Sequence, residues 1–316
     1  MNIKKILTDI ADPGKSLFSS QLADLSQATP ADVATFKTAW VLIGTPRRRE
    51  AASRLVELAK DNVELNFDII FKLLLSDVDD EVRATAIDGL WEHENPSIIR
   101  TFITIMENDR SDKVKAAAAS ALGIFSIMAE CGEIIPEYGK ILSTALLSSL
   151  NNTALSVDVR RRALESVAPF SLPAVREAIK AAYESRDERF RISSLFAMGK
   201  TCDESWLPII IKELDNPNAE IRYEAAGACG EVGAEECVAP LLQHINDSDT
   251  EVQLAVVQSL GKIGGREAKN GLQKASVKAA PAIKETIEQA LAEIETAEEM
   301  TLFEMKVPGS YDDKRN

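Results

Sequence analysis

One residue pattern recurs about every 31 positions over most of this 316-residue sequence. In each copy a β-branched or aromatic residue is followed by Arg, Lys or Gln, and small or apolar residues occur four and eight positions later. The copies begin at Val82, Val114, Val159, Phe190, Ile221, Val252 and Ile283. Positions four and eight residues apart lie on one face of an α-helix. Each copy is therefore predicted to contain an amphipathic helix.

A second apolar segment and a short polar turn precede each of these helices. The segments 206–214 and 238–245 are examples, and Asn216 and Pro217 lie in the turn after the first of them. Asn and Pro favour the end of one helix and the start of the next. A helical hairpin of this length cannot bury its apolar faces alone and must stack on its neighbours. The sequence therefore predicts an all-α chain of stacked helical hairpins.

The repeats resemble HEAT-like repeats, especially the short phycobilisome-lyase type. The resemblance covers roughly residues 65 to 295 and rests on a turn acid followed six positions later by a basic residue, as in Asp77 and Arg83. It implies a right-handed α-solenoid in which these charges form a ladder from repeat to repeat. Gln253 replaces the base, and Ala154 and Ser185 replace the acid, so we expect the ladder to be incomplete there.

The repeat pattern also predicts how the chain is divided. Residues 1–64 are expected to form a helical N-terminal cap, because terminal repeats must present a polar side to water. Residues 65–295 are expected to form the HEAT-like solenoid, with an insertion near 129–140 that protrudes as a loop. Residues 296–316 are rich in acidic side chains or lack periodicity, and we expect a flexible C-terminal tail.

Charge and hydropathy exclude two classes of partner. Acidic side chains outnumber basic ones by 50 to 36, which gives a formal net charge of −14. Nucleic-acid binding needs clustered positive charge, so no nucleic-acid partner is expected. No apolar run approaches the roughly 18 residues of a membrane-spanning helix, and Asp68 and Lys72 interrupt the best candidate. We therefore expect no membrane insertion.

The cysteines and the N-terminal residues predict a cytoplasmic protein. The 4 cysteines include no Cys-x-x-Cys pair, which favours reduced thiols over disulfides. Thr8 and Asp9 interrupt the apolar N-terminal stretch before it could form the core of a signal peptide.

Catalytic and metal-binding patterns are sparse. The only two histidines, His93 and His244, lie in segments without a nucleophile signature. Acidic residues at the repeat turns are read as helix caps rather than as metal ligands. We therefore predict no catalytic residue, no metal and no cofactor, although the sequence does not exclude an enzyme.

A binding surface is predicted on the face of the repeat helices that carries positions two and six. In a solenoid of this kind that face lines the concave groove, and the middle repeats place apolar side chains there. An apolar stripe with charged neighbours is typical of peptide-binding grooves. The alternative is that neighbouring helices cover these side chains as ordinary packing. The predicted groove residues are Arg161, Glu165, Ile192, Phe196, Tyr223, Leu254 and Gln258.

These observations predict a non-catalytic scaffold that binds a protein or peptide partner in its concave groove. The resemblance leaves an alternative of a different class open. Phycobilisome-type lyases carry similar repeats, so a bilin lyase or another protein that handles tetrapyrroles is implied as the second possibility.

Overall fold

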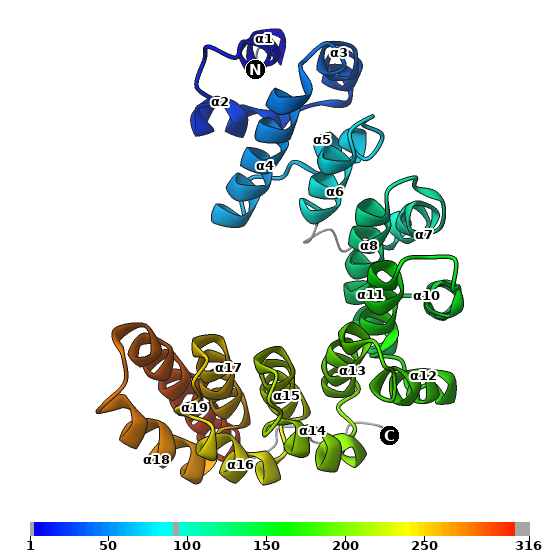
Figure 1. Cartoon of the computed structure of the whole chain (residues 1–316). Coiled ribbons are helices and arrows are strands. Elements are labelled where there is room, and N and C mark those ends of the chain that lie inside the picture. Colours follow the sequence, from blue (N-terminus) through cyan, green and yellow to red (C-terminus); the bar gives the residue numbers. More distant parts are fainter. Residues whose placement is uncertain (1–2, 91–94, 307–316) are drawn as a thin grey trace, which may run out of the picture. The chain divides into compact units, whose positions relative to one another are not determined.

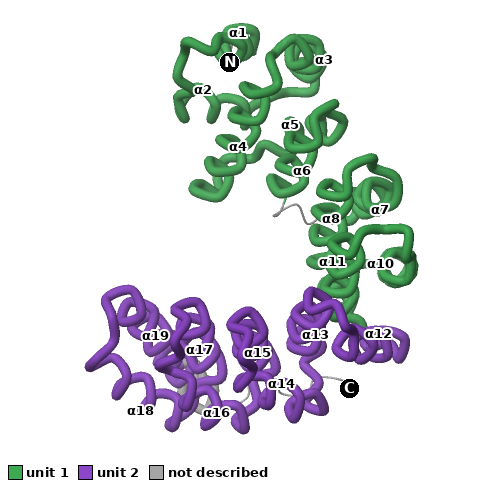
Figure 2. The backbone as a smooth tube through the Cα atoms, in the orientation of Figure 1, with its two compact units in different colours: residues 1–170 green, residues 171–316 purple. Residues whose placement is uncertain are grey.

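Helices form all the regular structure in residues 3–90 and 95–306, which this computed structural model describes (Figure 1). The predicted all-α fold of stacked helical hairpins is confirmed. The chain divides into two compact units, Met1–Phe170 and Ser171–Asn316 (Figure 2). The boundary between these two units does not coincide with a boundary of the predicted segments 1–64, 65–295 and 296–316. The predicted division into three segments stays a prediction.

The first unit is a row of short helices that pack in sequence order. Contacts join α4 to α6, α6 to α8 and α8 to α11, and each of these helices also packs against an outer neighbour. The elements are α1 (Ile3–Ala11), α2 (Ser19–Ala23), η1 (Asp24–Gln27), α3 (Pro30–Trp40), α4 (Thr45–Asp61), α5 (Asp68–Leu74), α6 (Asp80–Asp88), η2 (Pro96–Ile98), α7 (Ile99–Asn108), α8 (Asp112–Ala121), α9 (Gly123–Glu130), α10 (Pro136–Asn151) and α11 (Val157–Val167).

The second unit has two layers of helices (Figure 1). One layer contains α13, α15, α17 and α19, which pack on one another in that order, and each of them pairs with the helix that precedes it. The elements are α12 (Pro173–Tyr183), α13 (Glu188–Lys200), η3 (Glu204–Trp206), α14 (Leu207–Glu213), α15 (Ala219–Val232), η4 (Glu235–Cys237), α16 (Val238–Gln243), α17 (Thr250–Ile263), α18 (Gly265–Ser276) and α19 (Pro281–Lys306).

We call the helices of the two central rows, α4, α6, α8 and α11 in the first unit and α13, α15, α17 and α19 in the second, the inner helices. Polar turn residues fix where inner helices begin. The Asn218 side chain accepts a hydrogen bond from the backbone N–H of Glu220 at 2.9 Å. Asp249 accepts bonds from the N–H groups of Glu251 and Val252 at 2.9 and 3.3 Å. These bonds satisfy N–H groups that have no partner within the helix. The turns identified in the sequence therefore act as helix caps.

Small residues let successive inner helices approach closely. A Cβ atom on Gly230 would lie 2.6 Å from Ser259 Oγ, and one on Gly261 would lie 2.8 Å from Ala290 Cβ. The Ser259 hydroxyl donates to the Ala226 carbonyl oxygen at 2.7 Å, which joins α17 to α15. The stacking distance of these repeats thus depends on the absence of a side chain at the glycines.

The predicted charge ladder is present in both units. Arg83 donates from Nε and Nη2 to the Asp109 carboxylate of the next repeat, at 2.8 and 2.7 Å. Its Nη1 also donates to the Asp77 carbonyl oxygen at 2.8 Å, within its own repeat. Arg222 makes the same two-pronged contact with Asp247 in the second unit. Each Arg therefore connects two successive turns.

The ladder lacks a charge at Gln253, one of the predicted interruptions. Gln253 donates from Nε2 to the Asp247 carbonyl oxygen at 2.5 Å, so it keeps the bond within its repeat but carries no charge for the next one. Arg160, which follows Ala154, donates from Nε to the carbonyl oxygen of Leu150 at 2.8 Å.

In the repeat that carries Ser185 at the turn position, Arg191 faces the next turn, where neutral Asn216 replaces the acid and a different acid compensates. Glu213 is buried and accepts hydrogen bonds from the Tyr183 hydroxyl and from Asn216 Nδ2, both at 2.5 Å. Arg191 Nη2 lies 3.8 Å from the same carboxylate. A glutamate three residues before the turn thus provides the negative charge that neutral Asn216 lacks.

Three parts of the chain differ from the sequence-based expectations. The sequence reasoning missed α1, whose Ile6 and Leu7 are buried. The extra residues near 129–140 mostly lengthen helices α9 and α10, so the expected protruding loop is only the segment 131–135. The reason is that residues 123–130 contain no breaker after their first position, whereas Gly132 adopts φ 76° and Pro136 starts α10. The helix α19 runs to Lys306, and residues 307–316 of the predicted tail lie outside the described residues.

Candidate protein-binding face

Five of the seven predicted groove residues lie on three successive helices of the second unit. The helix α13 carries Ile192 and Phe196, α15 carries Tyr223, and α17 carries Leu254 and Gln258. Tyr223 is 42% exposed, Gln258 is also exposed, and the other three side chains are half-buried. The register of the repeats therefore places these five residues along one row of helices.

Three of these residues meet in a hollow of about 220 Å³ whose floor includes Gly227. We call it the Gly227 hollow. Because α13, α15 and α17 each contribute to its walls, it exists only in the stacked array. The hollow is lined by Phe196, Lys200, Tyr223, Glu224, Gly227, Ala228, Glu231, Ala255, Gln258, Ser259 and Lys262.

Opposite charges alternate along one side of the Gly227 hollow. Glu231 accepts hydrogen bonds from Lys200 and Lys262, one on each oxygen and both at 2.6 Å. Burial alone would raise the pKa of Glu231, but the two ammonium groups outweigh it and the pKa is lowered. The Lys200 ammonium also lies 5.5 Å from the centre of the Phe196 ring. These contacts fix the positions of the charged side chains around the apolar floor.

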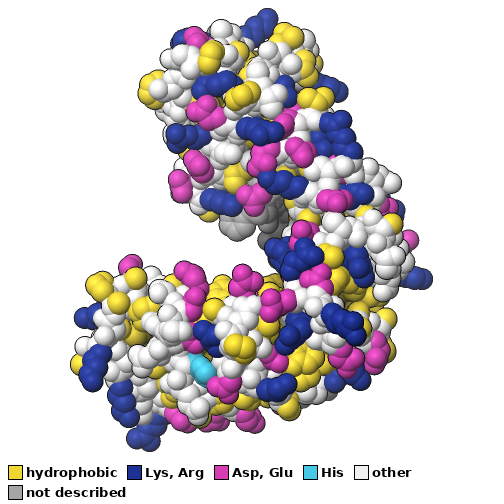
Figure 3. Space-filling model, viewed as in Figure 1, with side chains coloured by type: hydrophobic (Ala, Val, Ile, Leu, Met, Phe, Trp, Pro, Cys, Tyr) yellow, Lys and Arg dark blue, Asp and Glu magenta, His cyan; other side chains and the backbone are white. Residues whose placement is uncertain are grey.

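A second hollow of about 320 Å³ shares Tyr223 and Glu224 with the first. We call it the acidic hollow, because four carboxylates and no basic side chain line its described walls. Figure 3 shows acidic side chains next to hydrophobic ones over α15 and α17. The acidic hollow is lined by Ile192, Ala219, Glu220, Tyr223, Glu224, Asp249 and Glu251. The two hollows together form what we call the Tyr223 face.

The remaining predicted residues lie outside these hollows. Leu254 lines neither of them. Arg161 and Glu165 belong to the first unit, on α11. There Glu165 lies 3.6 Å from Arg161 Nη1 and accepts a bond from Arg162 Nη1 at 2.5 Å. These two predicted residues thus take part in a local charge cluster.

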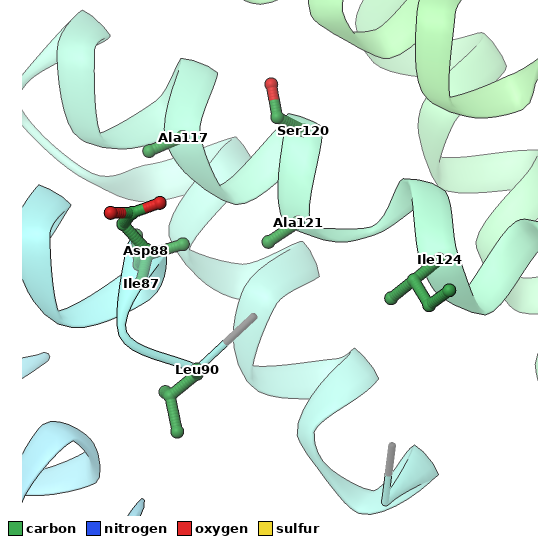
Figure 4. Close-up of a pocket in the computed structure, with 7 residues that line it drawn as sticks. All are labelled: Ile87, Asp88, Leu90, Ala117, Ser120, Ala121 and Ile124. Carbon is green, nitrogen blue, oxygen red and sulfur yellow. The ribbon is translucent and has the colours of Figure 1, made fainter. Parts of the chain in front are cut away.

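The first unit has hollows of its own, one of which is shown in Figure 4. It has a volume of about 310 Å³, and Asp88 from α6 and Ser120 from α8 carry its polar atoms. Asp88 pairs with Lys60 at 3.1 Å. The lining residues of this hollow are Ile87, Asp88, Leu90, Ala117, Ser120, Ala121 and Ile124.

Another hollow in the first unit lies between α1 and α3 and has a volume of about 710 Å³. Leu42, which is 83% exposed, stands at its edge beside Ile43. Lys4 is the only charged residue among those that line it. This hollow is broad and apolar, and no predicted groove residue contributes to it.

Potential metal ligands do not cluster in the part of the chain that the structure describes. Within residues 3–90 and 95–306, no group of three or more His, Cys, Asp or Glu side chains could hold a metal ion. His244 Nε2 lies 3.3 Å from Asp215 Oδ1, whereas His93 lies outside the described residues. Of the helices in these ranges, none combines the length and apolar character needed to cross a bilayer.

The sequence reasoning missed most of the charged residues on the Tyr223 face. Lys200, Glu231 and Lys262 occupy the tenth position after the start of successive repeat helices, so their signs alternate along the array. Glu220 and Glu251 occupy the position just before the first residue of the repeat pattern, which is Ile221 or Val252. Both positions share a helix face with positions two and six. Extending the predicted face by one turn in each direction would have found them.

Comparisons with known proteins identify the repeats. A family model described as HEAT repeats matches residues 67–149 and 207–292, which together make up more than half of the chain. Among curated proteins, none matches this sequence.

Solved structures are similar at low sequence identity. YibA of Escherichia coli is 18% identical, with 76% of this chain and 96% of that chain covered and a TM-score of 0.44. Human deoxyhypusine hydroxylase in complex with glycerol is 18% identical, with 83% and 95% covered and a TM-score of 0.36. Kap121p bound to Nup53p is 14% identical, with 97% and 39% covered and a TM-score of 0.45.

Proposed function

Because this chain belongs to the HEAT-repeat family, we propose that it is a non-catalytic scaffold that binds a protein or peptide on the Tyr223 face. One observation carries the proposal. Phe196, Tyr223 and Gln258 come from three successive repeats and line a single hollow. A surface assembled from several repeats offers an extended set of contacts, which is how repeat arrays bind other chains.

The chemistry of this face suits a protein partner. Aromatic side chains with a polar end are favoured at interfaces, because their rings give apolar contact and their hydroxyl groups give direction. Tyr223 is 42% exposed, and its hydroxyl makes no hydrogen bond within residues 3–90 and 95–306. The packing alternative accounts for half-buried Leu254, which lines neither hollow, but it leaves the exposure of Tyr223 without a reason.

Affinity capture tests this function. The full chain is used as bait in extract from its native cell, and a Phe196→Ala/Tyr223→Ala variant is used in parallel. We expect the variant to lose proteins that the wild-type chain captures, because hot spots at interfaces are dominated by a few aromatic anchors. Circular dichroism spectra of the two chains should agree.

A matched control removes exposed apolar side chains elsewhere. Phe18 is 60% exposed and Val277 is 82% exposed, and both lie outside the two hollows. The Phe18→Ala/Val277→Ala variant should capture the same proteins as the wild type. Equal capture by the Phe196→Ala/Tyr223→Ala variant would show that the binding face is elsewhere, and no specific capture by the wild type would argue against a scaffold.

The finer resemblance to phycobilisome-lyase repeats stays a prediction. The family model that matches is the general model of HEAT repeats. Bilin attachment has no support from the side chains of the Tyr223 face, and the absorbance spectrum of the protein purified from its native cell would test it.

A further inference from the structure

Gly227 is a glycine in the middle of α15 that the packing of the protein does not require. A Cβ atom built at this position would meet no other atom within 4 Å. Glycine inside a helix costs about 0.5–1 kcal/mol relative to alanine. The position is therefore occupied by a destabilising residue although the fold has room for a side chain.

Other glycines of the same helix row show the contrast. A Cβ atom on Gly230 would lie 2.6 Å from Ser259, and one on Gly199 would lie 2.8 Å from Ala228. Stacking explains these two glycines, but it does not explain Gly227. Gly227 lines the Gly227 hollow, and the open space next to it lets another molecule approach the backbone of α15 from outside.

The two hollows differ in charge. Around the Gly227 hollow, Lys200 and Lys262 are balanced by Glu231 and Glu224. Apart from Glu224, which both hollows share, the acidic hollow has three carboxylates and no basic side chain among its described lining residues. Glu220 and Glu251 form no ion pair within the described chain. A cation would therefore be attracted to the acidic hollow, whereas the neutral Gly227 hollow would accept an uncharged group.

We propose that the partner presents a short segment in which a Lys or Arg side chain lies close to an aliphatic side chain. The cation enters the acidic hollow between Glu220 and Glu251, beside the Tyr223 ring. The aliphatic side chain enters the Gly227 hollow, between Phe196 and Tyr223. This inference rests on the proposed function and adds the chemistry of the partner.

Tyr223 makes this pairing of side chains possible, because it lines both hollows. Its ring can contact the aliphatic group on one side and the cation on the other, and cations are attracted to aromatic rings. A partner segment with an acidic side chain in place of the cation would face the carboxylates of Glu220 and Glu251 and be repelled. The surface thus selects by charge as well as by shape.

Peptide selection tests the proposal directly. A random dodecapeptide library displayed on phage is selected on the immobilised full chain, and enriched peptides are synthesised with a fluorescent label. We expect them to contain Lys or Arg within a few residues of Leu, Ile, Val or Met. Fluorescence anisotropy then gives their affinity for the wild-type chain and for the variants.

Two variants probe the two hollows separately. Gly227→Gln places a side chain in the Gly227 hollow and should weaken the enriched peptides about tenfold or more. Glu220→Gln with Glu251→Gln should weaken them about fivefold and reduce the dependence of binding on salt, because exposed ion pairs contribute modestly and are screened. Gly227→Ala checks folding, because it should raise the thermal stability.

A charge-matched control lies in the same unit. Glu235 and Glu236 are exposed on η4 and line neither hollow. Glu235→Gln with Glu236→Gln removes the same charge and should leave peptide affinity within about twofold of the wild type. If this control weakens binding as much as the Glu220→Gln/Glu251→Gln variant, the effect is one of net charge and the proposal is wrong.

Other outcomes overturn the proposal as well. Enrichment of acidic peptides, failure to enrich any peptide, or full affinity of the Gly227→Gln variant would each contradict it. The proposed function can survive such a result. If capture of native partners still depends on Phe196 and Tyr223, the face binds proteins but recognises a different chemistry.

Discussion

Arg222 and Asp247 form a two-pronged ion pair that joins successive repeats of the second unit. Arg222 Nε donates to Oδ2 at 2.8 Å and Nη2 donates to Oδ1 at 2.7 Å. The side chains are only 12% and 6% exposed. Asp247 also accepts the backbone N–H of Asp249 at 2.8 Å, so the same carboxylate orders its own turn. One acid thus serves both the turn and the stacking of the repeats.

Loss of this acid should destabilise the protein. Asp247→Ala leaves the largely buried Arg222 guanidinium without its ion partner, and we expect the free energy of unfolding to fall by about 3 kcal/mol. Urea unfolding followed by circular dichroism measures this change. Asp215→Ala is the control, because the Asp215 side chain is 84% exposed and its removal should cost about 0.5 kcal/mol or less. Equal losses would show that the ladder has no special role.

Stability should fall in acid. The hydrogen bonds from Arg222 hold the pKa of Asp247 below its usual value, against the opposing effect of burial. Burial favours a raised pKa for Asp109, but the bonds from Arg83 outweigh it and the pKa is lowered. A group with a depressed folded-state pKa stabilises the fold above its unfolded pKa, about 3.9, and loses this effect as pH falls toward the folded value.

Thermal melts from pH 7 to pH 3 check this dependence. The melting temperature should change little above about pH 5 and fall below about pH 4. Asp247→Asn should start from a lower melting temperature at neutral pH and show a shallower fall in acid, because one of the linked carboxylates is gone. Parallel curves for the two proteins would contradict the role assigned to Asp247.

Two glycines three residues apart on α15 should respond in opposite ways to alanine. Gly230→Ala forces a Cβ atom against Ser259 and should destabilise the fold by about 1–3 kcal/mol. Gly227→Ala meets no atom within 4 Å and should stabilise it by about 0.5–1 kcal/mol. Urea unfolding of both variants is the measurement, and a loss of stability in Gly227→Ala would remove the main support for an open hollow.

The Tyr183 hydroxyl should lose its proton at a higher pH than the hydroxyl of an ordinary tyrosine. Burial and the hydrogen bond to Glu213 raise the pKa of Tyr183 to about 12. Because this pKa exceeds the unfolded value of about 10, the stabilisation is complete below pH 10 and is lost as pH rises toward 12. A spectrophotometric titration should show one phenolate step near the raised value, and Tyr183→Phe should abolish that step. An unchanged titration curve would refute the assignment.

Part of the fold could be derived from residue order alone. The repeat starting at Ile221 and the turn at Asn216 predicted both the helix α15 and its cap, because periodicity and turn chemistry are local properties. The contact of Arg83 with Asp109 was predictable only through the resemblance to known repeats. The role of Glu213 was not predictable, because it compensates for Asn216 through a hydrogen-bond network between two hairpins.

Only the apolar residues of the candidate site could be predicted from the sequence. Positions two and six of each helix point to one face, so Phe196 and Tyr223 were placed together by helical geometry. Gly227 lies on the same face, but the amino-acid sequence could not show whether a neighbouring helix fills the space next to this residue. The stacking of α13 and α17 on α15 decides this.

Residue order was enough to predict most of the helices and their caps, because each of these depends on residues a few positions apart in one hairpin. Which side chains of adjacent hairpins enclose a hollow could be seen only once the hairpins were packed together. The gap between stacked helices is set by the small residues where they touch, such as Gly230 against Ser259. The distance between hairpins, and with it the space above Gly227, is a property of the packed array.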